Sequence, residues 1–403
     1  MKKLAMMAIA LMVSTMTFAG DSDALKAIMK VKNYAEAAQM VNSNLGQLAD
    51  NAEKAKAYNH LVDLAMAKVS DEVGTLTENV VAKQTGGKEK PVDKIGMADA
   101  LTDAIYMAIE CNKYDQQPNA KGKISPKFDK KNAERIWQVR RQLIGIGQEE
   151  AQNNNDAAVL KYWGALVDSE VDPLFASQDH AAEAEWTGQV AYFAGRYAFQ
   201  AKEFDRANKY LEVAMKDPEQ KDEAMNYKLY AMRSNLKSHE DSVACINELK
   251  AMYEKEPAND VILDALNSMY EAQKDKAAQL ALLDGHLAKY PNSYTALAGK
   301  GFMAMNENDA PTAIMWLKKA TEAKPDNAVL FYYLGICYNS QAATSEDAAK
   351  RKEFYTDAIA AFDKAKELDP NKQMVNWGYN RYQAYYALYG EDDARTKEAE
   401  YDK

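Results

Sequence analysis

Residues 328–370 of the chain read AVLFYYLGICYNSQAATSEDAAKRKEFYTDAIAAFDKAKELDP. The first half of this stretch places Leu334 and Tyr338 four residues apart, and its second half places Ala358 and Phe362 in the same way. A spacing of four residues puts both side chains of each pair on one face of a helix. The stretch therefore predicts a helical hairpin, and a hairpin of this size cannot bury its apolar faces alone.

The same pattern recurs upstream in four more copies. Each copy has a small residue in the second helix, a bulky residue four positions later, and a closing proline. The prolines follow one another after 39, 34, 34 and 45 residues: Pro218, Pro257, Pro291, Pro325 and Pro370. Small residues in the first helices, Gly301 and Gly335 among them, are predicted to lie where two helices touch.

At these residues the chain resembles the tetratricopeptide repeat family, whose unit is a helix–turn–helix of about 34 residues. The match is closest for the units that end at Pro325 and Pro370. The resemblance implies an all-α fold, a right-handed superhelical solenoid of antiparallel helix pairs, that acts as a binding scaffold. A charged pair of end helices is expected over residues 377–388 and 391–401, where it would give the last repeat a polar, solvent-exposed outer face.

The N-terminal segment, residues 1–19, is typical of a secretory signal peptide. Lys2 and Lys3 precede an apolar run over residues 4–18, which is shorter than the roughly 20 residues that span a bilayer. No cysteine follows the expected cleavage point after Ala19. We therefore expect an exported, soluble protein of the periplasm that is not lipid-anchored. In this respect the chain resembles exported tetratricopeptide proteins of the Gram-negative envelope.

The remaining sequence is expected to form two regions. The first is a divergent N-terminal helical region, residues 20–131, with helices predicted over 52–68 and 95–112 and a long lysine-rich loop over 113–130. The second, residues 132–403, is the tetratricopeptide array with its C-terminal capping helices.

Composition and motifs exclude several classes of function. The formal net charge is -10, which argues against a nucleic-acid partner because such a protein needs a basic face. Three cysteines with no paired spacing indicate no disulfide framework. The four histidines form no metal-binding motif, and no nucleophile motif is present. We therefore expect no catalytic residue, no metal and no cofactor, and a non-enzymatic protein.

The family resemblance implies a peptide-binding groove on the concave face, formed by set positions of each first helix. These positions combine cations with aromatic and amide side chains, which suit a carboxylate or an extended peptide. Carried over residue by residue, they are Gln189, Tyr192, Arg196, Phe199, Tyr227, Tyr230, Lys237, Asn267, Tyr270, Phe302, Tyr332 and Asn339. Internal salt bridges are the alternative use of Arg196 and Lys237.

A second candidate surface comes from the spacing in the last repeat. Tyr338 and Ala358 lie further apart than their counterparts, so the second helix is predicted to start near Ser345 and to project. A ridge of Lys350, Arg351 and Lys352 would then contact a partner, unless it is only a solvated helix end. The sequence thus predicts a protein- or peptide-binding scaffold of the cell envelope. The alternative is a glycan- or nutrient-binding protein of the outer membrane surface, which exposed tryptophans would favour.

Overall fold

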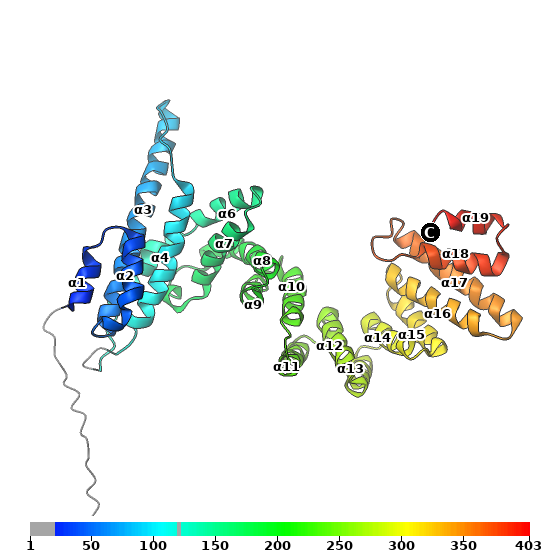
Figure 1. Ribbon diagram of the computed structural model, residues 1–403. Coiled ribbons are helices and arrows are strands. Elements are labelled where there is room, and N and C mark those ends of the chain that lie inside the picture. The colour runs from blue at the N-terminus through cyan, green and yellow to red at the C-terminus, as the bar shows by residue number, and fades with distance from the viewer. Residues whose placement is uncertain (1–20, 119–121) are drawn as a thin grey trace, which may run out of the picture. The chain divides into compact units, whose positions relative to one another are not determined.

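The computed structural model describes residues 21–118 and 122–403 (Figure 1). Across these residues the regular structure consists of nineteen α-helices and three short 3₁₀ turns, without a β-strand. The predicted all-α fold of antiparallel helix pairs is confirmed. The predicted signal peptide, residues 1–19, lies outside the described residues. Over 21–118 and 122–403, no helix has the length and apolar character needed to cross a membrane.

The chain divides into two compact units, and the division falls between Ala231 and Met232 inside helix α10. It lies within the predicted repeat array. The helices up to the division are α1 (Asp23–Lys30), α2 (Tyr34–Asn44), α3 (Asn51–Thr85), α4 (Lys94–Asp115), α5 (Asp129–Trp137), α6 (Gln142–Gln152), α7 (Asp156–Val171), α8 (Ala184–Gln200), α9 (Phe204–Ala214) and α10 (Lys221–Ser234). The helices of the second unit are α11 (His239–Lys255), α12 (Asp260–Ala272), α13 (Lys276–Lys289), α14 (Tyr294–Asn306), α15 (Ala310–Ala323), α16 (Ala328–Thr344), α17 (Ala348–Leu368), α18 (Gly378–Tyr389) and α19 (Ala394–Glu400).

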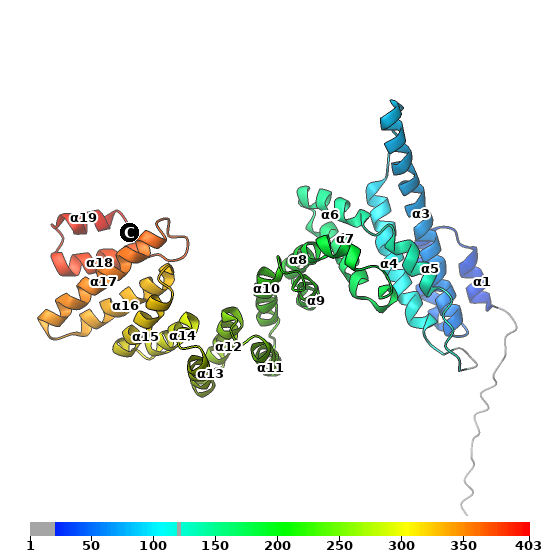
Figure 2. The same ribbon diagram turned by 180° about the vertical axis from the view of Figure 1, so that it is seen from behind.

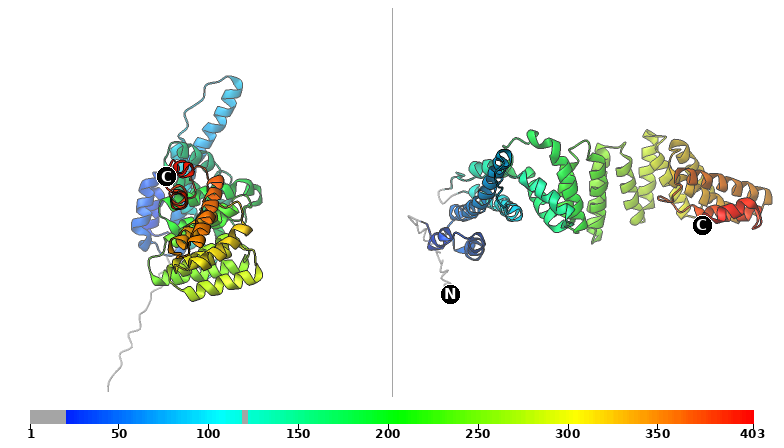
Figure 3. Two further views of the ribbon diagram at one scale, coloured as in Figure 1. Left: turned by 90° about the vertical axis from the view of Figure 1, so that its right-hand side faces the viewer. Right: turned by 90° about the horizontal axis from the view of Figure 1, so that it is seen from above.

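A long antiparallel pair, α3 and α4, dominates the first half of the first unit (Figures 1 and 2). The sequence predicted that α3 ends near residue 68, but the helix continues to Thr85 and its end extends beyond α4 (Figure 3). It ends there because Gly86, at φ +71°, adopts the left-handed conformation typical of helix C-termini. The returning loop is fixed to the helix by Asn79, whose side chain makes two 2.7 Å hydrogen bonds with the backbone of Lys90.

One backbone motif closes the first helix of four pairs. The second residue after the helix has a positive φ of 56–61°, and the N–H of the residue that follows it donates to the carbonyl five residues back at 2.9 Å. The four bonds are Asn155 to Glu150, Glu203 to Ala198, Asp275 to Tyr270, and Asp309 to Ala304. Recurrence of the same turn at α6/α7, α8/α9, α12/α13 and α14/α15 shows that these pairs are copies of one structural unit.

Helix starts in the second unit are equally regular. From α11 to α17, every helix begins with a polar side chain that accepts a hydrogen bond from a backbone N–H of the first turn, which satisfies an otherwise unpaired donor. These capping residues are Ser238, Asn259, Asp275, Ser293, Asp309, Asn327 and Asp347. The sequence therefore marks the start of each of these helices locally, independently of packing between helices.

Glycines lie where the helices of a pair touch, as predicted. A Cβ at Gly301 would lie 2.8 Å from Cγ of Leu317, and a Cβ at Gly335 would lie 2.7 Å from Cε1 of Phe362. Leu317 and Phe362 are fully buried. In these two pairs the second helix thus packs a large side chain directly onto the backbone of the first.

The end of the chain differs from the prediction in two respects. The extra residues of the last repeat lengthen both helices, since α16 runs to Thr344 and α17 begins at Ala348, with Ser345 in the turn. In the final helix pair most charged residues lie on α19, and the only charged residue of α18 is Arg381, which is buried. Helix α18 instead exposes tyrosines, with 54% of Tyr379 and 47% of Tyr386 accessible to solvent.

Candidate functional site

The half-buried Arg196 side chain of α8 lies among three aromatic rings. Its guanidinium carbon is 5.6 Å from the ring centre of Tyr192, 5.8 Å from that of Phe193 and 5.4 Å from that of Tyr227. Tyr227 lies on α10, before the division between the units. Such distances allow an attraction between the cation and the ring faces. We call these four residues the Arg196 cluster.

The local sequence explains this cluster. Tyr192 and Phe193 lie four and three residues before Arg196 on α8, so both rings are on the face of the helix that carries Arg196. The neighbouring face is covered by α9, because Gly195 admits Leu211 so closely that a Cβ would lie 2.7 Å from its Cγ. The rings also support one another, since the centres of Tyr192 and Tyr227 are 5.9 Å apart in an edge-to-face arrangement.

Arg196 has no carboxylate partner within the described residues. Its Nε is buried and makes no hydrogen bond there. The side chain lines a small hollow of about 210 Å³ together with Asp156, Phe193, Tyr197 and Gln200. Yet no ion pair joins Arg196 to Asp156 in this part of the chain. Because a buried donor is normally satisfied, the cluster is suited to an acceptor supplied from outside.

A nearby carboxylate is already engaged by a different donor. The Tyr192 hydroxyl donates to Oε2 of Glu223 at 2.6 Å. Burial raises the pKa of Tyr192 to about 12, and the hydrogen bond to Glu223 acts in the same direction. The hydroxyl therefore remains a neutral donor near neutral pH, and it holds Glu223 without the help of Arg196.

The other groove residues predicted in the first unit surround this cluster. Phe199 packs its ring 6.1 Å from that of Tyr227 and 5.6 Å from that of Phe204. Gln189 is exposed on α8, and Tyr230 of α10 is 55% exposed. The structure thus places the predicted residues of this unit on two helices, α8 and α10.

Lys237 does not occupy the helical position that the repeat pattern predicted. Helix α10 ends at Ser234, so Lys237 lies in the following turn, and its backbone N–H donates to the carboxylate of Asp241 at 2.9 Å. Asp241 also caps α11 with Ser238. Because the backbone N–H of Lys237 takes part in this turn, its side chain does not extend the face of α10. Lys237 also belongs to the second unit, whereas Arg196 belongs to the first.

The predicted groove residues of the second unit are largely used in packing. Tyr270 is buried under Lys250, and Phe302 packs edge-to-face against a neighbouring tyrosine ring. Asn380 of α18 donates to the Tyr332 hydroxyl at 3.1 Å and accepts from the Asn339 side chain at 3.1 Å. Asn267 lies on α12, and its Oδ1 is buried without a hydrogen bond in the described residues.

The predicted ridge is smaller than the sequence indicated. Arg351 folds back and donates from Nε and Nη2 to the carbonyl of Ser345, at 3.0 and 2.7 Å. It therefore closes the turn between α16 and α17. Lys350 and Lys352 remain exposed on the first turns of α17.

Sequence reasoning missed Asp156 and Gln200 of the Arg196 hollow, and it also missed two aromatic residues there, Phe193 and Tyr197. The family's groove positions skip both of them. The signal was nevertheless present, because Phe193, Arg196 and Tyr197 form a stripe with helical spacing along α8.

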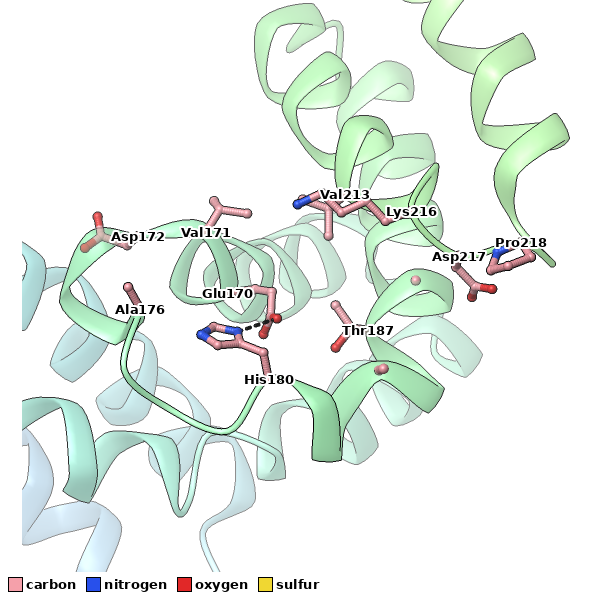
Figure 4. Close-up of a pocket in the computed structure, with 12 residues that line it drawn as sticks. Glu170, Val171, Asp172, Ala176, His180, Thr187, Val213, Lys216, Asp217 and Pro218 are labelled. Carbon is pink, nitrogen blue, oxygen red and sulfur yellow. Dashed lines mark hydrogen bonds and ion pairs between the residues drawn. The ribbon is translucent and has the colours of Figure 1, made fainter.

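A second hollow of the first unit was also missed (Figure 4). Its volume is about 530 Å³, and its walls come from the end of α7, the loop after it, α8 and the end of α9. Glu170, His180 and Thr187 point into it in the close-up. Glu170 is also bound by Arg140, which is fully buried and binds Glu183 as well.

His180 in this hollow is held through both ring nitrogens. Nδ1 lies 2.6 Å from Oε1 of Glu170, and Nε2 lies 3.0 Å from the carbonyl oxygen of Phe175. A histidine with both nitrogens engaged has none left for a metal or for accepting a substrate proton. Among the described residues, no group of three metal-ligating side chains comes together.

The repeated helix pairs define the class of fold: an all-α solenoid of antiparallel helix pairs of the tetratricopeptide type. No protein-family model matches the sequence. Among curated proteins, the chain is similar to the mouse interferon-induced protein with tetratricopeptide repeats 2, with 28% identity over 143 residues. That match covers 33% of this chain and only 30% of the mouse protein, so it concerns less than a third of the relative's length.

The chain is only distantly similar to solved structures. The human IFIT1 dimer with PPP-AAAA has a TM-score of 0.36 and 13% identity, covering 74% of this chain and 66% of that one. The APC/C hetero-tetramer Cut9–Hcn1 has a TM-score of 0.36 and 12% identity, covering 90% of this chain and 74% of that one. Likeness at this level says nothing of ligands.

Proposed function

We propose that this chain is a non-enzymatic binding protein and that the Arg196 cluster takes a carboxylate side chain from an extended segment of a partner polypeptide. The observation that carries this proposal is the Arg196 guanidinium, which lies among three rings with a buried, unsatisfied Nε and no carboxylate partner in the described residues. A guanidinium is the preferred partner of a carboxylate because its planar donors match the two oxygens.

The surroundings favour a peptide over other anions. Rings beside the cation offer apolar contact to a neighbouring peptide side chain, and Gln189 and Gln200 offer exposed amides on the same helix. A polyphosphate or nucleic acid would require several cations, whereas the chain carries a net charge of -10. The glycan alternative loses its main support, since each of the five tryptophans is at least partly buried.

The first prediction is that Arg196→Met weakens the binding of an acidic peptide. The probe is a fluorescein-labelled ten-residue peptide of alternating Glu and Ser, compared with its Gln–Ser counterpart by fluorescence anisotropy. The loss of one charge-assisted contact is expected to cost about 1.5–3 kcal/mol, which is roughly tenfold or more in Kd. Thermal unfolding should change little, because Arg196 makes no ion pair within the described residues and methionine can keep contact with the three rings.

Arg141→Met is the matched control for this experiment. Arg141 is an exposed arginine of the same unit that also lies beside an aromatic ring, at 5.8 Å from Trp186, but outside the Arg196 cluster. Its replacement should leave the affinity for the acidic peptide unchanged. Equal binding of the Glu–Ser and Gln–Ser peptides, or equal losses in the two variants, would show that the Arg196 cluster is not a carboxylate site.

We further propose that the protein is exported to the periplasm and carries no lipid anchor. The support is the sequence pattern of residues 1–19, with Lys2 and Lys3 before an apolar run and small residues at its end. The second prediction is that N-terminal sequencing of the protein from a periplasmic fraction yields a chain that begins at Gly20. Recovery of a chain that begins at Met1 in the cytoplasmic fraction would refute export.

A further inference from the structure

The second unit contains a pocket of about 440 Å³ whose walls are formed mainly by tyrosines. It lies among three helices that pack together at the end of this unit, α16, α17 and α18 (Figure 2). Its lining residues are Asn339, Ala343, Tyr355, Tyr379, Tyr382, Gln383, Tyr386 and Ala387. None of these described residues is charged, which sets the pocket apart from the Arg196 cluster.

Three of the tyrosines form a stripe along α18. Tyr379, Tyr382 and Tyr386 are spaced by three and four residues, so they share one face of the helix. With a rise of 1.5 Å per residue, the first and last lie about 10.5 Å apart along the axis. The ring centres of Tyr382 and Tyr386 are 5.9 Å apart. Lys403 covers the Tyr382 ring with its ammonium 3.5 Å from the centre, which helps to hold the ring in place.

The pocket also offers amide groups. Asn339 already donates to the Asn380 carbonyl at 3.1 Å. Gln383 is exposed between the tyrosines of α18, and its side chain has no hydrogen bond to any described residue. Its amide can therefore donate to a carbonyl of a bound molecule without breaking an existing bond.

We propose that this pocket binds an uncharged, proline-rich segment of a partner protein in the polyproline II conformation. That helix repeats every three residues with a rise of about 3.1 Å each, so equivalent prolines recur after about 9.3 Å, close to the length of the tyrosine stripe. Its carbonyls make no internal hydrogen bonds and are available to Gln383. Aromatic grooves are the usual receptors of such segments, whose preformed helix loses little entropy on binding. The proposal is independent of the Arg196 cluster.

The third prediction tests this site with fluorescein-labelled decaproline and the full chain. Decaproline is expected to bind the wild type and to bind the Tyr379→Ala/Tyr386→Ala double variant at least tenfold more weakly. Both tyrosines are about half exposed, so the variant should keep its circular dichroism spectrum and melting temperature. Gln383→Ala, a second variant at an exposed position, should weaken binding several-fold.

Tyr401→Ala serves as the matched control, since Tyr401 is a 92% exposed tyrosine of the same unit that does not line the pocket. The affinity of the Tyr401→Ala variant for decaproline should equal that of the wild type. The proposal is overturned if decaproline does not bind the wild type, or if the control loses as much affinity as the double variant. Binding of maltohexaose with the same dependence on Tyr379 and Tyr386, in place of decaproline, would assign the pocket to a glycan and overturn the proposed ligand.

Discussion

Replacement of Arg140 with methionine is expected to lower the free energy of unfolding by about 3–5 kcal/mol, the typical cost of removing one partner from a buried ion pair. Arg140 has no solvent-exposed surface. Its Nη1 donates to the Leu166 carbonyl at 3.0 Å and to the Ser169 hydroxyl at 2.8 Å, and its Nη2 binds Glu170 at 2.7 Å and also Glu183. Methionine fills most of the space but leaves Glu183 without its arginine partner and leaves Glu170 with only its contact to His180.

The stability lost in Arg140→Met should depend on pH, and the direction of this dependence follows from the pKa of Glu183. Burial raises the pKa of Glu183 above its ordinary value, and Arg140 opposes that rise. A carboxyl whose pKa is raised in the folded state favours folding at low pH, and this contribution is lost as the pH rises through the folded pKa. Without Arg140 the pKa of Glu183 rises further, so the variant should recover part of its stability on acidification.

Urea unfolding at about pH 7.5 and about pH 4.5 measures this dependence, and the difference from the wild type should be smaller at the lower pH. Arg141→Met, which removes the exposed neighbour, should change the stability by less than about 0.5 kcal/mol. The Arg140→Met/Glu183→Gln double variant should lose less stability than the sum of the losses in the two single variants, because it removes the buried carboxylate that Arg140→Met leaves unpaired. A purely additive double variant would show that Arg140 acts only through packing.

The repeat pairs were predictable from sequence because each is specified locally. The caps Asp309 and Asn327 mark the starts of helices, while Gly301 and Ala313 mark close contacts within one pair. The end of α3 was missed although Gly86 follows it directly, in the place where a left-handed C-terminal residue is expected. That signal could have located the end at Thr85.

The candidate site was only partly predictable. Arg196 and Tyr192 were predicted from the family's groove positions. Phe193 is not at a groove position, although its helical spacing places it on the same face as Arg196. Whether Arg196 had a carboxylate partner depended on contacts between helices, and Glu223 turned out to be engaged by a tyrosine hydroxyl. Lys237 was misplaced because periodicity alone does not show where α10 ends. Arg140 was missed because its partners come from separate segments of the chain.

Replacement of Gly335 with leucine is expected to lower the free energy of unfolding of the second unit by about 1–3 kcal/mol, the usual cost of overpacking. Even a single Cβ at Gly335 would lie 2.7 to 2.9 Å from three atoms of the Phe362 ring. Phe362 is fully buried, and Ala358 and Ala365 on the same helix are fully buried as well, so the ring cannot move without shifting α17. A leucine therefore forces the two helices of the repeat apart.

The matched control is Gly285→Ala, on α13 of the same unit. A Cβ there meets no atom within 4 Å, so the only change is the loss of glycine's flexibility in the unfolded chain. The free energy of unfolding of this variant should be about 0.5–1 kcal/mol higher than that of the wild type. Circular dichroism during urea unfolding compares the two variants with the wild type. An unchanged midpoint for Gly335→Leu would mean that α16 and α17 do not touch at this point, which would remove the close helix contact on which the repeat assignment depends.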